Sequence, residues 1–305
     1  MASFLQSNAW ERFQRAAGAT THRVAGALLI ERTTPLGRYW YCPRPSLDEP
    51  ALRTIEAAAK DAGVLFVRLD PETPLPAPTL PTAATAHTEP GDSLVLSLAP
   101  TTDELLSSFH EKTRYNIRVA LRNELEVEES SDPDSRALTA FLQFAQKTGA
   151  RQGFRYHADH YYRTMLEVLG QPNDEGITAS ALVAHRNNDQ AAAMIVVWTP
   201  EIVYYLHGAS WYERRQWMAP HLLQWTAIQR AKERGASAYD FWGIAPMNPD
   251  QTPVDPNHAW AGVTRFKLGF GGEVVHYPDA VDLLVRPAQY HAYGVARRLR
   301  RALPF

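Results

Sequence analysis

The apolar positions of the first hundred residues change their spacing several times, which predicts strands and helices in alternation. A short amphipathic stretch at 9–17 predicts a helix, and β-rich runs at 22–32 and 38–42 predict a pair of strands. A stretch with one apolar side predicts a helix over 47–62, which ends at Gly63. The remaining predictions for this part are a buried strand at 64–69, a proline-rich surface excursion at 71–91 and a strand at 93–98.

The segment 102–123 has the clearest helical period in the first half. Apolar residues recur along one side from Leu106 to Leu121, and Thr102 or Asp103 is a typical N-cap, so a single helix is predicted. The opposite face carries Arg114, Arg118 and Arg122. Such a basic face is either solvated or placed to approach a phosphate.

The second half shows the same mixture of periods from near Pro133 onward. Predicted helices cover 136–148, 158–169, 220–234, 264–269 and 287–302. Predicted strands cover 179–184, 191–199, 202–208 and 239–244, with further strands inside 273–285. Pro220 suits the first turn of its helix, and Gly235 suits the end of that helix. Both halves therefore predict a mixed α/β fold.

Length and composition fit one large or two modest globular domains. The chain has 305 residues, 45% of them hydrophobic and 21% charged, with a formal net charge of −2. A near-neutral chain lacks the overall basicity of proteins that coat nucleic acid, so any RNA contact must come from a local patch. The single cysteine, Cys42, excludes an internal disulfide framework and a cysteine-based zinc site. Because the N-terminal stretch lacks a signal-peptide core and no run approaches ~20 apolar residues, we expect a cytoplasmic protein.

The most informative motif surrounds Lys267. It reads Arg265-Phe266-Lys267-Leu268-Gly269-Phe270-Gly271-Gly272-Glu273. We expect Phe266 and Phe270 to pack inward on either side of Lys267 and to hold its ammonium at a fixed place. A fixed cation suits binding of an anion, or of negative charge that develops during a reaction. Taken alone, Lys267 also fits a structural role, with its stem on the rings and its head in water.

Three further motifs occur in an order that matches a known family. They are Phe4-Leu5-Gln6-Ser7-Asn8-Ala9-Trp10, Lys112-Thr113-Arg114-Tyr115-Asn116-Ile117-Arg118 and Tyr239-Asp240-Phe241-Trp242-Gly243-Ile244. With the motif around Lys267, they make the chain resemble the FemABX family, aminoacyl-tRNA-dependent transferases that add amino acids to the peptide of peptidoglycan precursors. The resemblance covers nearly the whole chain. It is to the shorter members, because the inserted helical hairpin of the longer ones is missing.

The resemblance implies two tandem acetyltransferase-like (GNAT-like) domains, with the C-terminal helix returning to the first domain. The first domain is expected to cover 1–133 plus 280–305. The second is expected to cover 134–279 and to carry the motif around Lys267.

The resemblance also implies a role for Lys267, and the neighbouring residues supply further candidates. It places Lys267 near the reacting ester, as the electrostatic stabiliser of the tetrahedral intermediate or of the leaving ribose hydroxyl. Asp240 is the second catalytic candidate, as a base for the attacking amine; pairing with a cation and capping of the following turn remain open. The candidates for substrate binding are Tyr205, Tyr239, Trp242, Arg265 and Phe270. Packing alone also explains the aromatic ones.

The implied donor is an aminoacyl-tRNA, and the implied acceptor is the stem peptide of lipid II or of a UDP-linked muropeptide. No metal or organic cofactor is required, because the donor ester supplies the driving force. The basic stretch 297–301 fits tRNA phosphates, the anionic inner leaflet of the membrane, or the dipole of its own helix. A monomer is expected. The sequence does not define which amino acid is transferred.

Two other classes of protein fit parts of the sequence. An acyl-CoA-dependent N-acyltransferase of the same fold binds pyrophosphate on backbone amides after its central strand. Here that loop, 211–220, contains no glycine and ends in Pro220, which has no N–H. A non-catalytic relative that only binds a cell-wall precursor is disfavoured by the intact motif around Lys267. Phosphate-loop, GxSxG and GxGxxG motifs are missing, which argues against ATP hydrolysis, serine hydrolysis and dinucleotide redox chemistry.

Overall fold

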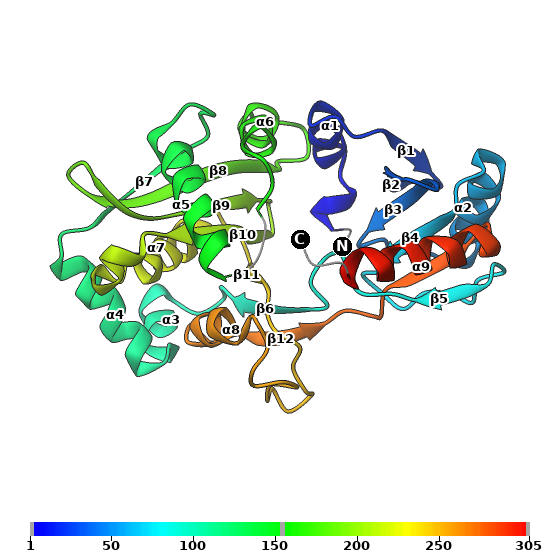
Figure 1. Ribbon diagram of the computed structural model, residues 1–305. Helices are drawn as coiled ribbons and strands as arrows, with labels where there is room; N and C mark the ends of the chain where they lie inside the picture. Colours follow the sequence, from blue (N-terminus) through cyan, green and yellow to red (C-terminus); the bar gives the residue numbers. More distant parts are fainter. Residues whose placement is uncertain (1–2, 153–155, 303–305) are drawn as a thin grey trace. The chain divides into compact units, whose positions relative to one another are not determined.

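The computed structural model describes residues 3–152 and 156–302. Contacts divide the chain into two units, Met1–Gly91 with Tyr277–Phe305, and Asp92–His276 (Figure 1). Each unit is built on its own sheet of parallel and antiparallel strands with helices beside it. The predicted mixed α/β fold with two sheets is therefore confirmed, and the last helix belongs to the first unit, as expected.

The first crossing between the units lies after residue 91, whereas the sequence led us to place it at 133. The intervening segment belongs to the second unit because β6 (Asp92–Ser97) pairs with both β11 (Ala238–Gly243) and β12 (Glu273–His276). Farther along, β7 (Glu126–Ser130) pairs with β8 (Thr178–Arg186). The partners of β6 lie far away in sequence, so no local pattern marks this boundary. The return to the first unit at Tyr277 lies close to the predicted position, 280.

The first unit has the strand order β1-β2-β3-β4-β13-β5 among the described residues. Its strands are β1 (Thr21–Val24), β2 (Ala27–Thr34), β3 (Gly37–Pro43), β4 (Phe66–Asp70), β5 (Thr82–Ala84) and β13 (Val281–Leu284). Its helices are η1 (Phe4–Gln6), α1 (Asn8–Ala16), α2 (Glu49–Ala62) and α9 (Pro287–Ala302). Asp48 caps α2 through the N–H of Ala51, and Gly63 ends it at a left-handed φ of 62°.

Two predictions for the first unit need correction. The strand predicted over 22–32 is two strands, because Ala25 and Gly26 adopt φ values of 49° and 80° and turn the chain back on itself. The excursion predicted over 71–91 contains the short strand β5, which pairs with β13. Its pairing partner comes from the other end of the chain, so the local sequence did not indicate it.

The second unit has the strand order β12-β6-β11-β10-β9-β8-β7 among the described residues. The strands not yet given are β9 (Asp189–Trp198) and β10 (Ile202–Ser210). The helices are α3 (Thr102–Ser108), α4 (Glu111–Arg122), α5 (Arg136–Gln152), α6 (Asp159–Leu169), η2 (Tyr212–Trp217), α7 (Ala219–Glu233) and α8 (Ala261–Leu268). Among the described residues, β10 and β11 are the parallel pair of this sheet, and its other neighbouring strands are antiparallel.

The single helix predicted over 102–123 is broken into α3 and α4. Phe109 and His110 between them have extended ψ values of 151° and 142°. The break lets Phe109 enter the core, where it is 1% exposed, and lets the His110 side chain cap α4. Leu121, predicted on the inner side, is instead 54% exposed.

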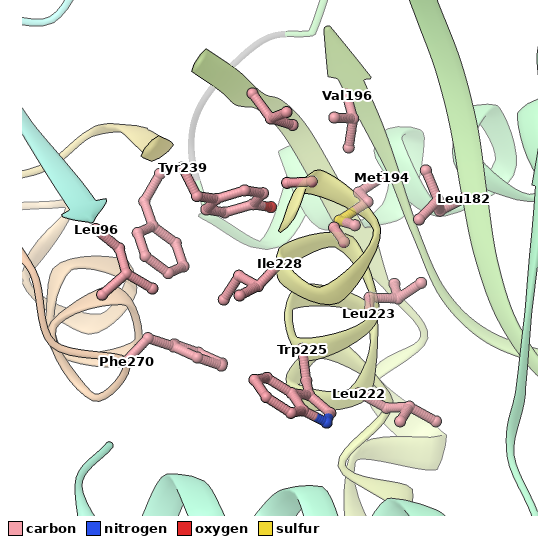
Figure 2. Close-up of a cluster of buried hydrophobic side chains, with 14 of the residues drawn as sticks. Leu96, Leu182, Met194, Val196, Leu222, Leu223, Trp225, Ile228, Tyr239 and Phe270 are labelled. Atoms are coloured by element: carbon pink, nitrogen blue, oxygen red, sulfur yellow. The ribbon is translucent and has the colours of Figure 1, made fainter. Parts of the chain in front are cut away.

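The core of the second unit lies between α7 and the sheet. Figure 2 shows Leu223 and Ile228 of α7 beside Met194, with Tyr239 and Phe270 completing the cluster. All five are buried. Because β11 and Phe270, which follows α8, are both anchored in this cluster, the two ends of the segment that carries Lys267 are tied to the core.

The glycine turn after α8 should be sensitive to a single methyl group. Gly272 has a φ of 104°, and a Cβ added there would lie 2.7 Å from the carbonyl oxygen of Val95 on β6. Gly272→Ala should therefore lower the free energy of unfolding by about 1–3 kcal/mol. Urea denaturation followed by tryptophan fluorescence measures this.

Gly262→Ala is the matched control, because Gly262 lies in α8 and a Cβ there meets nothing within 4 Å. It should be neutral or stabilise by about 0.4–1 kcal/mol. Equal losses in the two variants would contradict a specific steric role for Gly272.

Candidate functional site

The candidate site lies where the parallel strands β10 and β11 cease to pair. Their register runs only from Ile202 opposite Ala238 to Tyr204 opposite Asp240. Beyond it, β10 is irregular between Tyr205 and His207, and β11 is irregular between Asp240 and Gly243. Backbone and side chains at the carboxyl ends of parallel strands are the usual place for ligands in α/β proteins.

Lys267 is fixed at this place by α8. Its side chain is 6% exposed, and Nζ donates a 2.7 Å hydrogen bond to the carbonyl oxygen of Gly243. Nζ also lies 5.3 Å from the centroid of the Tyr205 ring, a cation–π distance. One turn earlier, Thr264 accepts a 2.8 Å hydrogen bond from the N–H of Ala245. The helix is therefore attached to the end of β11 by two neighbouring side chains.

Burial changes the protonation of Lys267. Loss of water lowers the pKa of its ammonium to about 7, while the charge of Asp240 opposes that shift. Near neutral pH the amine therefore exists in both forms. The protonated form can donate to an oxyanion or give a proton to a leaving oxygen, which is the chemistry expected of this residue.

Two titratable groups beside Lys267, Tyr205 and His207, are uncharged at neutral pH. Burial raises the pKa of the Tyr205 phenol to about 12. Burial, together with smaller effects of His157 and Lys267, lowers the pKa of the His207 imidazole to about 3. Lys267 is therefore surrounded by a neutral phenol and a neutral imidazole, with the charge of Asp240 nearby.

Asp240 stabilises the irregular end of β11. It is 2% exposed, and its Oδ1 accepts hydrogen bonds from Ser93 Oγ and, at 2.7 Å, from the N–H of Trp242. Trp242 has a left-handed φ of 63°, an uncommon value for a large residue. The capping role that the sequence left open is thus present. The electrostatic effect of Asp240 on Lys267 is present as well.

Two of the five substrate-binding candidates lie at Lys267 or beside it. Tyr205 is half-buried with its ring toward Lys267. The Tyr205 hydroxyl lies 1.9 Å from where a Cβ on Gly208 would be, so the absence of a side chain at Gly208 leaves room for the Tyr205 ring. Trp242 is half-buried and packs edge-on against Tyr204 at 5.8 Å. Arg265 is exposed and lines a separate pocket of about 160 Å³ with Asp255.

The other two candidates belong to the core. Tyr239 is 0% exposed, and its hydroxyl donates to Gln224 Oε1 at 2.8 Å; Phe270 is also 0% exposed. Neither surface is open to a substrate. The expected cage of Phe266 and Phe270 is also different, because these rings pack against each other at 5.4 Å and against His221. The ring beside the ammonium is that of Tyr205, which is remote in sequence.

The motif at 112–118 acts as a support for the glycine turn. Thr113 is buried, and its Oγ1 lies 2.4 Å from where a Cβ on Gly269 would be. The N–H of His110 donates to the Gly269 carbonyl at 2.9 Å. Arg114 donates to the carbonyl oxygens of Ser107 and Phe109 at the end of α3, so this arginine holds the break between the two helices.

Sequence reasoning missed His207, Ser93 and the carbonyl of Gly243. His207 follows Tyr205 by two residues, but the irregularity between them in β10 interrupts the alternation of side chains, so strand spacing did not place His207 beside Lys267. Ser93 and the Gly243 carbonyl are set by strand pairing and by the turn of β11, which no local pattern reports.

Two features of the described chain bear on ligands and membranes. Within residues 3–152 and 156–302, the structure contains no cluster of three or more His, Cys, Asp or Glu suited to a metal ion. In the same part of the chain, every helix is too short or too polar to cross a membrane. The basic stretch predicted at 297–301 falls on α9, but the side chains of 298–301 lie outside the described residues.

The fold and the site together define a two-unit, two-sheet α/β protein with a buried cation at the end of a parallel strand pair. This chain belongs to the FemAB family, whose sequence model matches residues 78–174 and 171–298. The structure is similar to the crystal structure of FemX, with a TM-score of 0.75 and 18% identity over 95% of this chain and 94% of that one. It is also similar to L-PGS from Bacillus licheniformis, with a TM-score of 0.58 and 14% identity over 95% of each chain.

Among curated proteins, the chain is similar to the lipid II:glycine glycyltransferase of Staphylococcus aureus. The two are 24% identical over an alignment of 247 positions, which covers 61% of this chain and 56% of that protein. The match therefore spans little more than half of the relative.

Burial of Lys267 should cost stability. Because the folded-state pKa is lowered, the unfolded chain binds the proton more strongly, and the cost is complete below pH about 7. It is relieved as the pH rises from about 7 toward the ordinary lysine value of about 10.4. Lys267→Met should therefore raise the Tm by about 2 °C or more at pH 6, with a smaller gain at pH 9. Thermal melts at both pH values measure this. A lower Tm for the variant at pH 6 would show that Lys267 is mainly structural.

Proposed function

We propose that this protein is an aminoacyltransferase that moves an amino acid from aminoacyl-tRNA to the stem peptide of a peptidoglycan precursor. The observation that supports it most is the buried ammonium of Lys267, hydrogen-bonded to Gly243 at the end of the parallel strand pair. Membership of the FemAB family and similarity to a lipid II:glycine glycyltransferase support the same activity.

The reaction needs orientation and charge stabilisation more than activation. The acceptor amine attacks the carbonyl carbon of the aminoacyl ester, a C–N bond forms, and the bond from the carbonyl carbon to the ribose oxygen breaks. The amine loses a proton and the ribose oxygen gains one. Lys267 in its protonated form stabilises the tetrahedral oxyanion or protonates the departing ribose oxygen. The ester supplies the driving force, so the proposal requires no metal or organic cofactor.

Asp240 acts in this proposal through Lys267. Its Oδ1 is occupied by Ser93 and Trp242, and its charge keeps the Lys267 ammonium protonated to a higher pH. We therefore assign Asp240 a positioning role, in place of the base for the acceptor amine that the sequence also allowed.

The substrates contact the half-exposed side of the site. Tyr205 and Trp242 are the half-buried aromatic residues at the strand ends, and exposed Arg265 offers a cation on α8. We propose lipid II or a UDP-linked muropeptide as the acceptor, because both present the same stem-peptide amine.

An acyl-CoA donor fits the structure less well. The chain between β10 and α7 forms the 3₁₀ helix η2 with large side chains, and Pro220 removes an N–H from the start of α7. The adjoining pocket has a volume of about 120 Å³, well below the ~300–1,000 Å³ of typical small-molecule sites. A cofactor with a pyrophosphate would lack the converging backbone N–H groups that usually bind its phosphates.

Transfer of radiolabelled amino acids from a charged tRNA pool to lipid II and to UDP-linked muropeptide tests the function. Lys267→Met should lower the rate by about 10²–10³-fold, the usual loss for one oxyanion donor. Lys267→Arg is a partial control, because it keeps the charge in a different shape.

A parallel assay with labelled acetyl-CoA tests the rival class. Transfer from acetyl-CoA alone would overturn the proposal. Full activity of the Lys267→Met variant would show that Lys267 takes no part in the reaction.

The pH dependence of the transfer rate should reveal Lys267. If the protonated amine is the active form, the rate falls as the pH rises through about 7. Asp240→Asn removes the charge that raises the pKa of Lys267, so the fall should move to lower pH. The rate of Lys267→Met should show no fall in this range. An unchanged profile in Asp240→Asn would contradict the positioning role.

A further inference from the structure

A cluster of aromatic rings and cations covers the chain that leaves β10. It consists of Trp211, the 3₁₀ helix η2 and two cations from neighbouring elements. Lys147 Nζ lies 3.8 Å from the ring centroid of Trp211, Arg215 4.3 Å from that of Tyr212, and Arg186 and Arg214 lie 4.8 and 5.1 Å from that of Trp217. We call these residues the η2 surface. Trp217 packs against the core cluster and Trp211 against Phe144, whereas Tyr212 and Arg215 face outward and take no part in the reaction chemistry described above.

Some members of the η2 surface hold it in place, and others are exposed, with Arg215 over the Tyr212 ring and donating to the Tyr212 carbonyl at 3.3 Å. Arg214 donates 2.6 Å hydrogen bonds to the Gln190 carbonyl and to Asp189, which ties η2 to the turn between β8 and β9. Tyr212 is 51% exposed, and Arg215 is exposed beside it. Glu213 is also exposed and is the acidic member of the segment. The surface thus presents an accessible ring and an accessible guanidinium on an anchored backbone.

The η2 surface adjoins the helix that carries Lys267. The pocket of about 120 Å³ is lined by Trp211, Arg214 and Arg215 and also by Phe266 of α8. Phe266 directly precedes Lys267 in α8. A chain that lies on η2 and ends in this pocket therefore ends beside α8.

We propose that the η2 surface docks the single-stranded 3′ end of an RNA, the donor side of the transfer proposed above, on which this inference rests. Bases stack on exposed aromatic faces, and interleaved arginine and lysine side chains neutralise the phosphates; this combination is typical of single-strand binding. The near-neutral net charge of −2 leaves such a patch as the means of RNA contact.

Other occupants fit this surface less well. A pyrophosphate needs converging backbone amides, which a segment without glycine and with Pro220 does not supply. A double helix presents its phosphates without open base faces, so it leaves Tyr212 without a stacking partner. The alternation of rings and cations matches a strand with unstacked bases.

Fluorescence anisotropy with an uncharged RNA minihelix tests the proposal. The minihelix is used with a four-nucleotide single-stranded 3′ end and in a blunt form. The native protein should bind the form with the single strand at least about 10-fold more tightly. Tyr212→Leu and Arg215→Gln should each weaken that binding about 10-fold, the scale of one lost base stack. Arg215→Gln should also reduce the slope of log K against log salt by about 0.7, whereas Tyr212→Leu should leave the slope unchanged.

Arg234→Gln is the matched control. Arg234 makes the same kind of contact, 3.7 Å from the Trp198 ring, but follows the end of the 15-residue helix α7, about 22 Å from η2 at ~1.5 Å per residue. It should bind both RNA forms as the native protein does. All these side chains lie at the surface, so equal Tm values for the variants show that folding is intact.

The outcomes separate this inference from the proposed function. Native affinity in both η2 variants, or equal affinity for the blunt minihelix, overturns the η2 surface as the docking site. If tRNA-dependent transfer nevertheless occurs, the proposed function stands without it. A native protein that neither transfers nor binds RNA overturns both.

Discussion

The arrangement of the site in the second unit depends on the burial of one lysine ammonium, that of Lys267. Lys267 keeps one hydrogen bond to Gly243 and a contact with the Tyr205 ring in exchange for its water. A buried cation with so few polar partners stays in place only if those partners are themselves fixed. Anchoring of α8 by Thr264 and capping of β11 by Asp240 supply that rigidity. The pKa of Lys267 is lowered because the buried amine has lost most of its water, and this lowered pKa suits the amine to the proposed reaction.

The separate motifs of the second unit contact one another around this lysine. The glycine turn after α8 needs Gly269 to accommodate Thr113 and Gly272 to approach Val95. The segment 239–244 supplies Asp240 and the Gly243 carbonyl. Segments far apart in sequence therefore fix the position of the Lys267 ammonium together.

The opening motif has a comparable structural role in the first unit. Gln6 accepts a 2.7 Å hydrogen bond from the N–H of Leu28, and its amide donates to the Pro43 carbonyl. Ser7 caps α1 through the N–H of Trp10 at 3.0 Å. A glutamine and a serine at the start of the chain thus connect the ends of β2 and β3 to the first helix.

The sequence alone determined the mixed α/β class, most helix and strand positions, and Lys267 as the residue to examine, because periodicity, caps and glycine turns act over a few neighbouring residues. It did not determine the break at Phe109, the unit boundary at residue 91, or the aromatic partner of Lys267. Tyr239 and Phe270 were assigned to the substrate and lie in the core, since a local pattern cannot tell which face of a strand or turn is covered. Those features depend on strand pairing and side-chain packing between distant segments, and only the tertiary structure decides them.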